Sequence, residues 1–150
     1  MKTAILAIGK ARDAEAEWGA EYLKRLKGEV AVKEFTAPKG LPPAETQKAE
    51  AEKLLKAVPP KAFVVLLDER GKDMGSRDFA VKLKSWQERG SDIVFLIGGA
   101  DGVTDEVRKR ADFMLGFGRL TWPHRLARVM LLEQLYRAQQ INAGHPYHRD

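Results

Sequence analysis

Two runs of consecutive apolar residues constrain the fold of this chain more than any other feature. "FVVLL" (63–67) and the run within "DIVFLIGG" (92–99) have no polar residue between their ends. A strand with one face in water alternates apolar and polar residues, whereas an uninterrupted apolar run indicates a strand that is covered on both faces. Strands of this kind are typical of α/β proteins, in which helices cover both sides of a mostly parallel sheet.

The rest of the chain alternates strand-like and helix-like segments in the order that such a fold requires. Residues 14–26 carry an apolar stripe with a spacing of four, and prolines flank a second helical segment at 43–58. We expect Ser76 and Thr104 to cap two further helices. The expected strands are 3–9, 29–36, 63–67, 92–99 and 112–118, and the last helix is 123–141. The sequence therefore predicts a single α/β domain, residues 1–150, with a mostly parallel sheet of five to six strands.

Composition excludes several classes of function. The chain has 150 residues and no cysteine, so a disulfide framework, a thiolate zinc site and a thiol nucleophile are excluded. No apolar stretch is long enough to span a bilayer, and the short N-terminal run fits a first strand better than a signal peptide, which predicts a cytoplasmic protein. The formal charge of +5 suits an anionic partner such as nucleic acid. Basic and acidic residues are interspersed, however, so charge alone does not decide the partner.

Three loops follow the predicted buried strands, where ligands of open α/β sheets bind. "IGGADG" (97–102) fits neither the dinucleotide fingerprint nor the P-loop, so it is either a loop that approaches a ligand closely or a tight turn. "GFGRLTWPH" (116–124) has a backbone free to read a planar heterocycle such as adenine; Thr121 is a candidate cap and Pro123 the expected start of the helix. In "LDERG" (67–71), taken singly, we favour a solvated loop over a ligand site.

The C-terminal "NAGHPYHRD" (142–150) contains two of the three histidines, His145 and His148; the third is His124. A metal site is not expected, because Pro146 breaks any helix between the two imidazoles and no cysteine completes a site. Two interpretations stay open for this tail. It is either a substrate-facing element or a chain end that is pinned to the core.

Three of these segments resemble one protein family. "FLIGGADG", "LTWPHRLARVMLLEQLYRA" and the terminal "NAGHPYHRD" are similar to the RlmH (YbeA-type) group of the SPOUT class of methyltransferases. The resemblance covers essentially the whole chain, including its length and the opening "AIGK". One departure is Trp122, where an aliphatic residue is more usual and where the larger ring is expected to narrow the pocket.

The resemblance implies a methyl transfer from S-adenosylmethionine to N3 of a pseudouridine in 23S ribosomal RNA. The expected substrate is this RNA within the assembled ribosome. The resemblance also implies a homodimer and a C-terminal trefoil knot, which sequence patterns alone do not predict. A homodimer agrees with the last predicted helix, which is apolar around more than one side. The cofactor-binding positions that carry over are Leu67, Gly99, Gly118, Arg119, Leu120, Thr121, Trp122 and Pro123.

For the tail, the resemblance favours a catalytic role. Tyr147 is suited to stacking on a base, and Arg149 to holding a phosphate or the developing anion. His148 is the candidate general base because its reference pKa lies near neutrality, and His145 is expected to shape the turn. No metal is required for this chemistry. Two rival functions stay open: a ribosome- or RNA-binding module without activity, and an enzyme that uses a nucleotide cofactor on a small metabolite.

Overall fold

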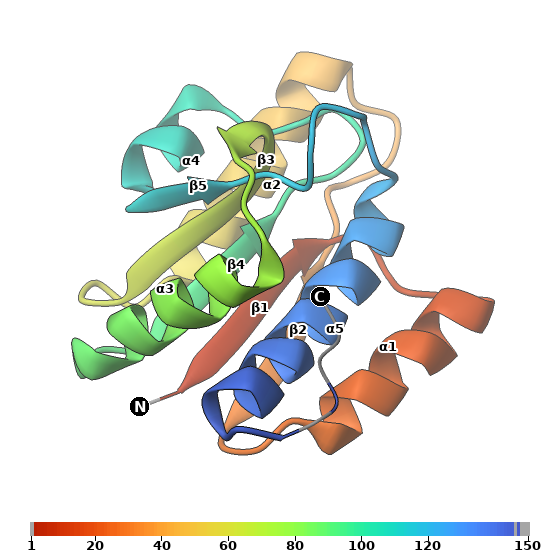
Figure 1. Cartoon of the computed structure of the whole chain (residues 1–150). Coiled ribbons are helices and arrows are strands. Elements are labelled where there is room, and N and C mark those ends of the chain that lie inside the picture. The colour runs from red at the N-terminus through yellow and green to blue at the C-terminus, as the bar shows by residue number, and fades with distance from the viewer. Residues whose placement is uncertain (1, 146, 148–150) are drawn as a thin grey trace.

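A five-stranded, all-parallel sheet organises the protein, with helices on both faces (Figure 1). The computed structural model describes residues 2–145 and 147. The elements are β1 (Thr3–Ile8), α1 (Asp13–Arg25), β2 (Val30–Phe35), α2 (Pro43–Ala57), β3 (Phe63–Lys72), α3 (Ser76–Glu88), β4 (Ile93–Ile97), α4 (Asp105–Arg110), β5 (Phe113–Leu115) and α5 (His124–Asn142). The predicted α/β class and the alternation of elements are confirmed.

The strand order is β2-β1-β4-β3-β5, so β1, β3 and β4 are interior strands. The two uninterrupted apolar runs belong to β3 and β4, and all five residues of β4 are buried. Side chains alternate along β4: Phe95 faces one core cluster and Leu96 the other. This alternation is why neither strand tolerates a polar position in its apolar run.

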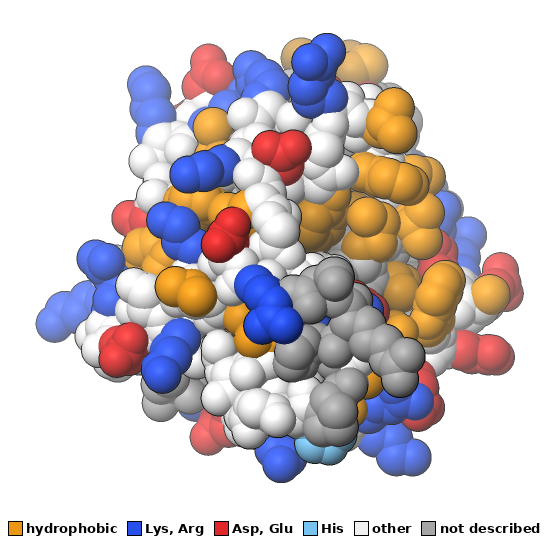
Figure 2. Space-filling model, viewed as in Figure 1, with side chains coloured by type: hydrophobic (Ala, Val, Ile, Leu, Met, Phe, Trp, Pro, Cys, Tyr) orange, Lys and Arg blue, Asp and Glu red, His pale blue; other side chains and the backbone are white. Residues whose placement is uncertain are grey.

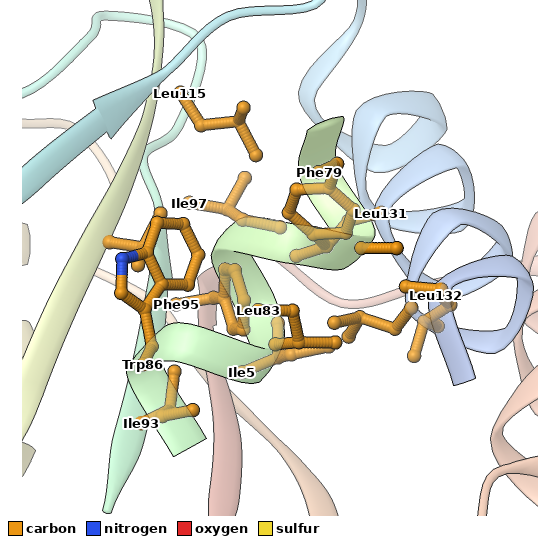
Figure 3. Packing of buried hydrophobic residues seen from close by; sticks show 14 of the residues in the cluster. Ile5, Phe79, Leu83, Trp86, Ile93, Phe95, Ile97, Leu115, Leu131 and Leu132 are labelled. Carbon is orange, nitrogen blue, oxygen red and sulfur yellow. The ribbon is translucent and has the colours of Figure 1, made fainter. Parts of the chain in front are cut away.

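The larger core cluster lies between the sheet and the three helices α1, α3 and α5. Figure 1 shows α5 lying between α1 and α3 over this face. Trp86 of α3 is 4% exposed, and its ring centroid lies 5.3 Å from those of Phe63 and Phe113. Figure 3 shows Leu131 and Leu132 of α5 reaching toward the same cluster. Helices α2 and α4 cover the opposite face through Leu54 and Val107.

β3 continues beyond its apolar run, and its far end crosses the chain that follows β5. The pairing register shifts between Leu67 and Lys72, and the Gly116 N–H donates to the Lys72 carbonyl at 3.0 Å. A Cβ atom on Gly71 would lie 2.6 Å from the Leu115 carbonyl carbon. Glycine is therefore required where these two backbones touch. The trefoil knot implied by the resemblance stays a prediction.

The expected helix caps differ in the structure. Gly75, not Ser76, is the N-cap of α3, and the Ser76 hydroxyl donates to Gln134 Oε1 at 2.8 Å. Thr104 is the N-cap of α4, but its hydroxyl oxygen is buried without a hydrogen-bond partner. Pro123 is the N-cap of α5, which begins one residue later than predicted. The Ser76 hydroxyl bonds to a residue distant in the sequence and the Thr104 hydroxyl bonds to none, so neither makes the local bond of a capping hydroxyl.

Candidate functional site

The second half of β3 and the loops that follow β4 and β5 meet at the carboxyl edge of the sheet and line one cleft of about 860 Å³. This is where open parallel sheets bind their ligands. Its lining includes seven of the eight predicted cofactor-binding residues: Leu67, Gly99, Gly118, Leu120, Thr121, Trp122 and Pro123. Arg119 is exposed and is not among the lining residues. Three segments that lie far apart in the sequence are thus brought together as predicted.

The loop after β4 rests on α2. A Cβ atom on Gly99 would lie 2.9 Å from Ile8 Cγ2 and 3.0 Å from Glu50 Oε2. The Gln47 side-chain amide donates to the Asp101 carbonyl and fixes the far end of the loop. Gly99 therefore presents its backbone to the cleft while its missing side chain makes room for Ile8 and Glu50 behind it. The glycine has a packing reason that the sequence interpretation did not contain.

Glu50 is an unusual carboxyl group, since it is 8% exposed and its Oε1 is buried without a partner. Burial raises its pKa, and the nearby charge of Asp101 raises the pKa further. The sequence analysis did not single it out. Glu50 lies on the buried side of α2, whose other acidic residues are exposed. Its position in the apolar periodicity of α2 was therefore the only sequence signal that this carboxyl group is buried.

The loop after β5 is closed by two hydrogen bonds. The Trp122 indole N–H donates to the Phe117 carbonyl at 3.0 Å, and the Thr121 hydroxyl donates to Glu69 Oε2 at 2.7 Å. Gly118 has a φ of +89°, a conformation that favours glycine. Leu120 and Trp122 are 72% and 39% exposed, which is high for large apolar side chains. The loop therefore offers both backbone groups and apolar surface to a ligand.

His124 also lines the cleft, although the sequence analysis gave it no role. It is the first residue of α5, and its Nε2 lies 3.0 Å from the position of a Cβ atom on Gly9. Burial lowers its pKa, and the adjacent guanidinium groups of Arg125 and Arg128 lower the pKa further. His124 is therefore neutral at physiological pH, and a neutral imidazole offers one donor and one acceptor. The histidine directly after a helix-starting proline was the available sequence signal.

An ion pair between the buried Arg128 and the exposed Glu34 holds the turn after β1 against α5 beside His124. Arg128 is 5% exposed and donates to a carboxylate oxygen of Glu34 and, at 2.8 Å, to the Gly9 carbonyl. Burial by itself would raise the pKa of Glu34, but hydrogen bonds from the Ala11 N–H and Arg128 outweigh it, and the pKa is lowered.

Asp68 corrects the interpretation of "LDERG" as a solvated loop. Its side chain is only 8% exposed, and it accepts hydrogen bonds from Arg70 and Arg108. Glu69 is likewise engaged, through Thr121. Glu69 and Arg70 are exposed, Arg70 at 61% of its side chain. Residues 67–71, predicted as a loop, instead belong to β3 and form part of the mouth of the cleft.

The tail is described only in part. Tyr147 packs on α5: its hydroxyl donates to Glu133 Oε2 at 3.0 Å, and its ring lies 4.7 Å from that of Tyr136. Burial and the Glu133 carboxylate raise the pKa of Tyr147. Tyr147 does not line the cleft of its own chain, and His145 is exposed. The candidate catalytic residues His148 and Arg149 lie outside the described residues, as does Pro146.

The lining of the cleft fits a nucleoside-type methyl donor. Apolar side chains of Leu67, Ile97, Leu115 and Ala127 provide surface for a planar ring, and two glycine-containing loops provide backbone donors and acceptors. Within residues 2–145 and 147, no group of three metal-ligating side chains is close enough to hold a metal ion. No helix in the described part of the chain is long and apolar enough to cross a membrane.

A parallel sheet with glycine loops around a cleft at its carboxyl edge places this protein in the class of α/β proteins that bind ligands at that edge. The family model described as "Predicted SPOUT methyltransferase" matches residues 1–148. The chain belongs to this SPOUT methyltransferase family, whose members use a methyl donor.

Relatives agree with this assignment. Proteins named "Ribosomal RNA large subunit methyltransferase H" from Rhodospirillum centenum and Paramagnetospirillum magneticum are 51% and 48% identical, with 99% of each chain covered. The protein of the same name from Carboxydothermus hydrogenoformans is 43% identical over 99% of this chain and 100% of its own. A probable methylase family protein from Haemophilus influenzae Rd KW20 has a similar fold, with a TM-score of 0.58 at 14% identity, over 99% of this chain and 70% of its own.

Proposed function

We propose that this protein transfers a methyl group from S-adenosylmethionine to N3 of a pseudouridine in 23S ribosomal RNA, within the assembled ribosome and in the cytoplasm. The observation that carries the proposal is the cleft formed by Leu67, Gly99, Gly118 and residues 120–123, in a chain about half identical to proteins named for methylation of large-subunit ribosomal RNA. S-adenosylmethionine, when bound, supplies an activated methyl group, so the protein has mainly to align the acceptor with it.

The residues of the chain divide this work. Backbone groups of Gly99, Gly118 and residues 120–123 would hold the adenosine part, and the exposed faces of Leu120 and Trp122 would cover it. The pseudouridine N3–H loses its proton as the methyl group is transferred, which calls for an acceptor or for a cation near the developing anion. We assign these roles to His148 and Arg149 of the tail, with Tyr147 placing the base.

We propose further that the protein acts as a homodimer. A groove of about 630 Å³ lies between α1, α5 and the start of α3, lined by apolar residues that include Trp18, Met74, Leu126 and Met130. Figure 2 shows hydrophobic side chains gathered on this side of the molecule, and Trp18 is 54% exposed. The groove shares Phe117 and Gly118 with the cofactor cleft. A second copy seated on the groove would bring its tail to the edge of that cleft.

Methyl transfer to ribosomes tests the activity. Ribosomes that lack the modification are incubated with S-adenosylmethionine labelled in its methyl group, and the labelled nucleotide is mapped. Label on N3 of one pseudouridine of 23S ribosomal RNA is the expected result. Calorimetric heat with S-adenosylmethionine separates an enzyme from an RNA-binding module, which gives none.

The homodimer has its own test. Sedimentation at micromolar concentration should give the mass of two chains, and Met130→Asp, which places a charge in the apolar groove, should give the mass of one. A wild-type monomer would contradict this part of the proposal.

A further inference from the structure

One buried carboxylate gathers two guanidinium groups at the mouth of the cleft. Asp68 Oδ1 accepts from the Arg70 backbone N–H at 2.8 Å and from Arg70 Nε at 3.4 Å, and Asp68 Oδ2 accepts from Arg108 Nε at 3.3 Å. The side chain of Asp68 is 8% exposed, so these bonds are shielded from water. Burial by itself would raise the pKa of Asp68, but the bonds from Arg70 and Arg108 outweigh it, and the pKa is lowered.

The carboxylates of Asp68 and Asp105 balance the charge of the two guanidinium groups, but these pairs leave guanidinium N–H donors unused within the described residues. Arg108 makes one further ion pair, through Nη1 to Asp105 at 3.1 Å, but Asp105 is 88% exposed and such a pair contributes little. Arg70 has no acidic partner other than Asp68 among the described residues, and its side chain is 61% exposed. Asp68 therefore brings two positive groups together, and their outward-facing donors remain available to an anion.

The same two arginines line a second groove that leads away from the cleft. This shallow groove follows the edge strand β5 and also contains Lys72 and Lys109. Two carboxylates, Asp105 and Asp112, line it as well, so four basic side chains are set against two acidic ones. Both lysines are exposed and make no ion pair within the described part of the chain. Figure 2 shows basic side chains on the side of the molecule where Figure 1 places β5 and α4. A strand that enters the cleft thus has a groove of net positive charge by which to leave it.

We propose that Arg70 and Arg108, held together by Asp68, bind a backbone phosphate next to the nucleotide in the cleft, and that Lys72 and Lys109 bind phosphates farther along the edge of β5. The proposal rests on the RNA methyltransferase function proposed above. Guanidinium groups suit phosphate oxygens because of their planar, multiple donors. Asp68 is a positioning residue in this arrangement and does not touch the RNA.

The carboxylate of S-adenosylmethionine is the other anion that could reach this position. The structure favours the RNA phosphate, because Arg70 is mostly exposed and its groove runs outward along β5. The two sources make different predictions. An arginine that binds the cofactor carboxylate supports cofactor affinity, whereas one that binds RNA supports affinity for the ribosome.

The test compares Arg70→Gln/Arg108→Gln with wild type, and Arg89→Gln serves as the matched control. Arg89 is an exposed arginine at the end of α3. It lies near the amino ends of the strands, away from the cleft at their carboxyl ends. In the double variant we expect the KM for ribosomes to rise about tenfold or more, with kcat and S-adenosylmethionine affinity within about twofold of wild type. The slope of log K for ribosome binding against log salt should fall by about one, while Arg89→Gln leaves both quantities unchanged.

Asp68→Asn separates positioning from simple charge. This variant increases the net positive charge at the groove, so general electrostatic attraction predicts tighter binding to ribosomes. Loss of positioning instead predicts weaker binding, and we expect a higher KM. Circular dichroism checks that the variant is folded. If Asp68→Asn does not fold, Arg70→Gln, a change at an exposed position, still tests the proposal.

Two outcomes would overturn the proposal. One is a double variant whose KM and salt slope match those of Arg89→Gln. The other is a tenfold loss of S-adenosylmethionine affinity, which would assign the arginines to the cofactor. If wild type methylates no ribosome, the proposed function fails by itself, and the salt slope of ribosome binding still tests the arginines.

Discussion

Replacing Gly99 by alanine tests whether the packing behind the cofactor loop sets its position. The added Cβ would lie 2.9 Å from Ile8 Cγ2, and 3.0 and 3.2 Å from the two carboxyl oxygens of Glu50. Contacts under about 3 Å require something to move. Ile8 and Glu50 are 4% and 8% exposed, so neither side chain has open solvent to move into. The loop itself, with its backbone in the cleft, is the part that can shift.

The magnitude follows from two opposing effects. Overpacking of a well-packed site typically costs about 1–3 kcal/mol, while alanine stabilises by about 0.4–1 kcal/mol because it restricts the unfolded chain. We therefore expect a net loss of about 1–2 kcal/mol, which lowers the Tm by about 2–8 °C in a chain of this size. Gly75→Ala is the matched control, because Gly75 has no atom within 4 Å of its Cβ position and an ordinary φ of −70°. Gly75 is the N-cap of α3, where alanine is less favourable than glycine, and this loss offsets the gain from restricting the unfolded chain, so the expected net change is close to zero.

Thermal unfolding and titration calorimetry with S-adenosylmethionine measure the two consequences. We expect Gly99→Ala to bind the cofactor about tenfold more weakly, which corresponds to about 1.4 kcal/mol. Ile8→Leu removes the contacting Cγ2 methyl group, so the double variant should recover part of the loss, with a coupling of at least about 0.5 kcal/mol. A Gly99→Ala protein with wild-type Tm and wild-type cofactor affinity would refute the argument that Ile8 and Glu50 position the loop.

Three further predictions concern the tail and two buried groups. Deleting residues 147–150 should cost about 1 kcal/mol of stability, because the hydrogen bond from Tyr147 to Glu133 and the ring contact with Tyr136 are lost. It should leave S-adenosylmethionine affinity nearly unchanged while methylation of ribosomes collapses; surviving activity would remove the tail from catalysis. The pKa of Glu50 is raised in the folded protein, so stability is lost as pH rises from the ordinary pKa of 4.5 through the folded value. Glu50→Gln should therefore flatten the fall in urea midpoint between about pH 5 and pH 8. An equal fall in both proteins would contradict this. Arg128→Met removes the buried guanidinium from the exposed Glu34 carboxylate and from the Gly9 carbonyl, and should cost about 1.5–3 kcal/mol in chemical denaturation, whereas a loss below about 0.5 kcal/mol would show that water replaces the guanidinium.

The sequence by itself determined the class of fold and the edge of the sheet that carries the site. The uninterrupted apolar runs of β3 and β4 require cover on both faces, and the helical stripes between them supply it. These signals are local, since the periodicity of a strand or helix is set by residues a few positions apart. The loops at 97–102 and 116–124 were identified for the same reason, because buried strands end directly before them.

Only the tertiary structure decided which polar groups meet. The hydroxyls of Ser76 and Thr121 bond to Gln134 and Glu69, each more than fifty positions away, in place of capping a nearby helix. Asp68 is buried because Arg108 reaches it from α4, although the two residues that follow it, Glu69 and Arg70, are charged. The order β2-β1-β4-β3-β5 creates these encounters, and no local pattern specifies which strands pair. Burial and charge pairing depend on neighbours in space, and those neighbours exist only after the chain has folded.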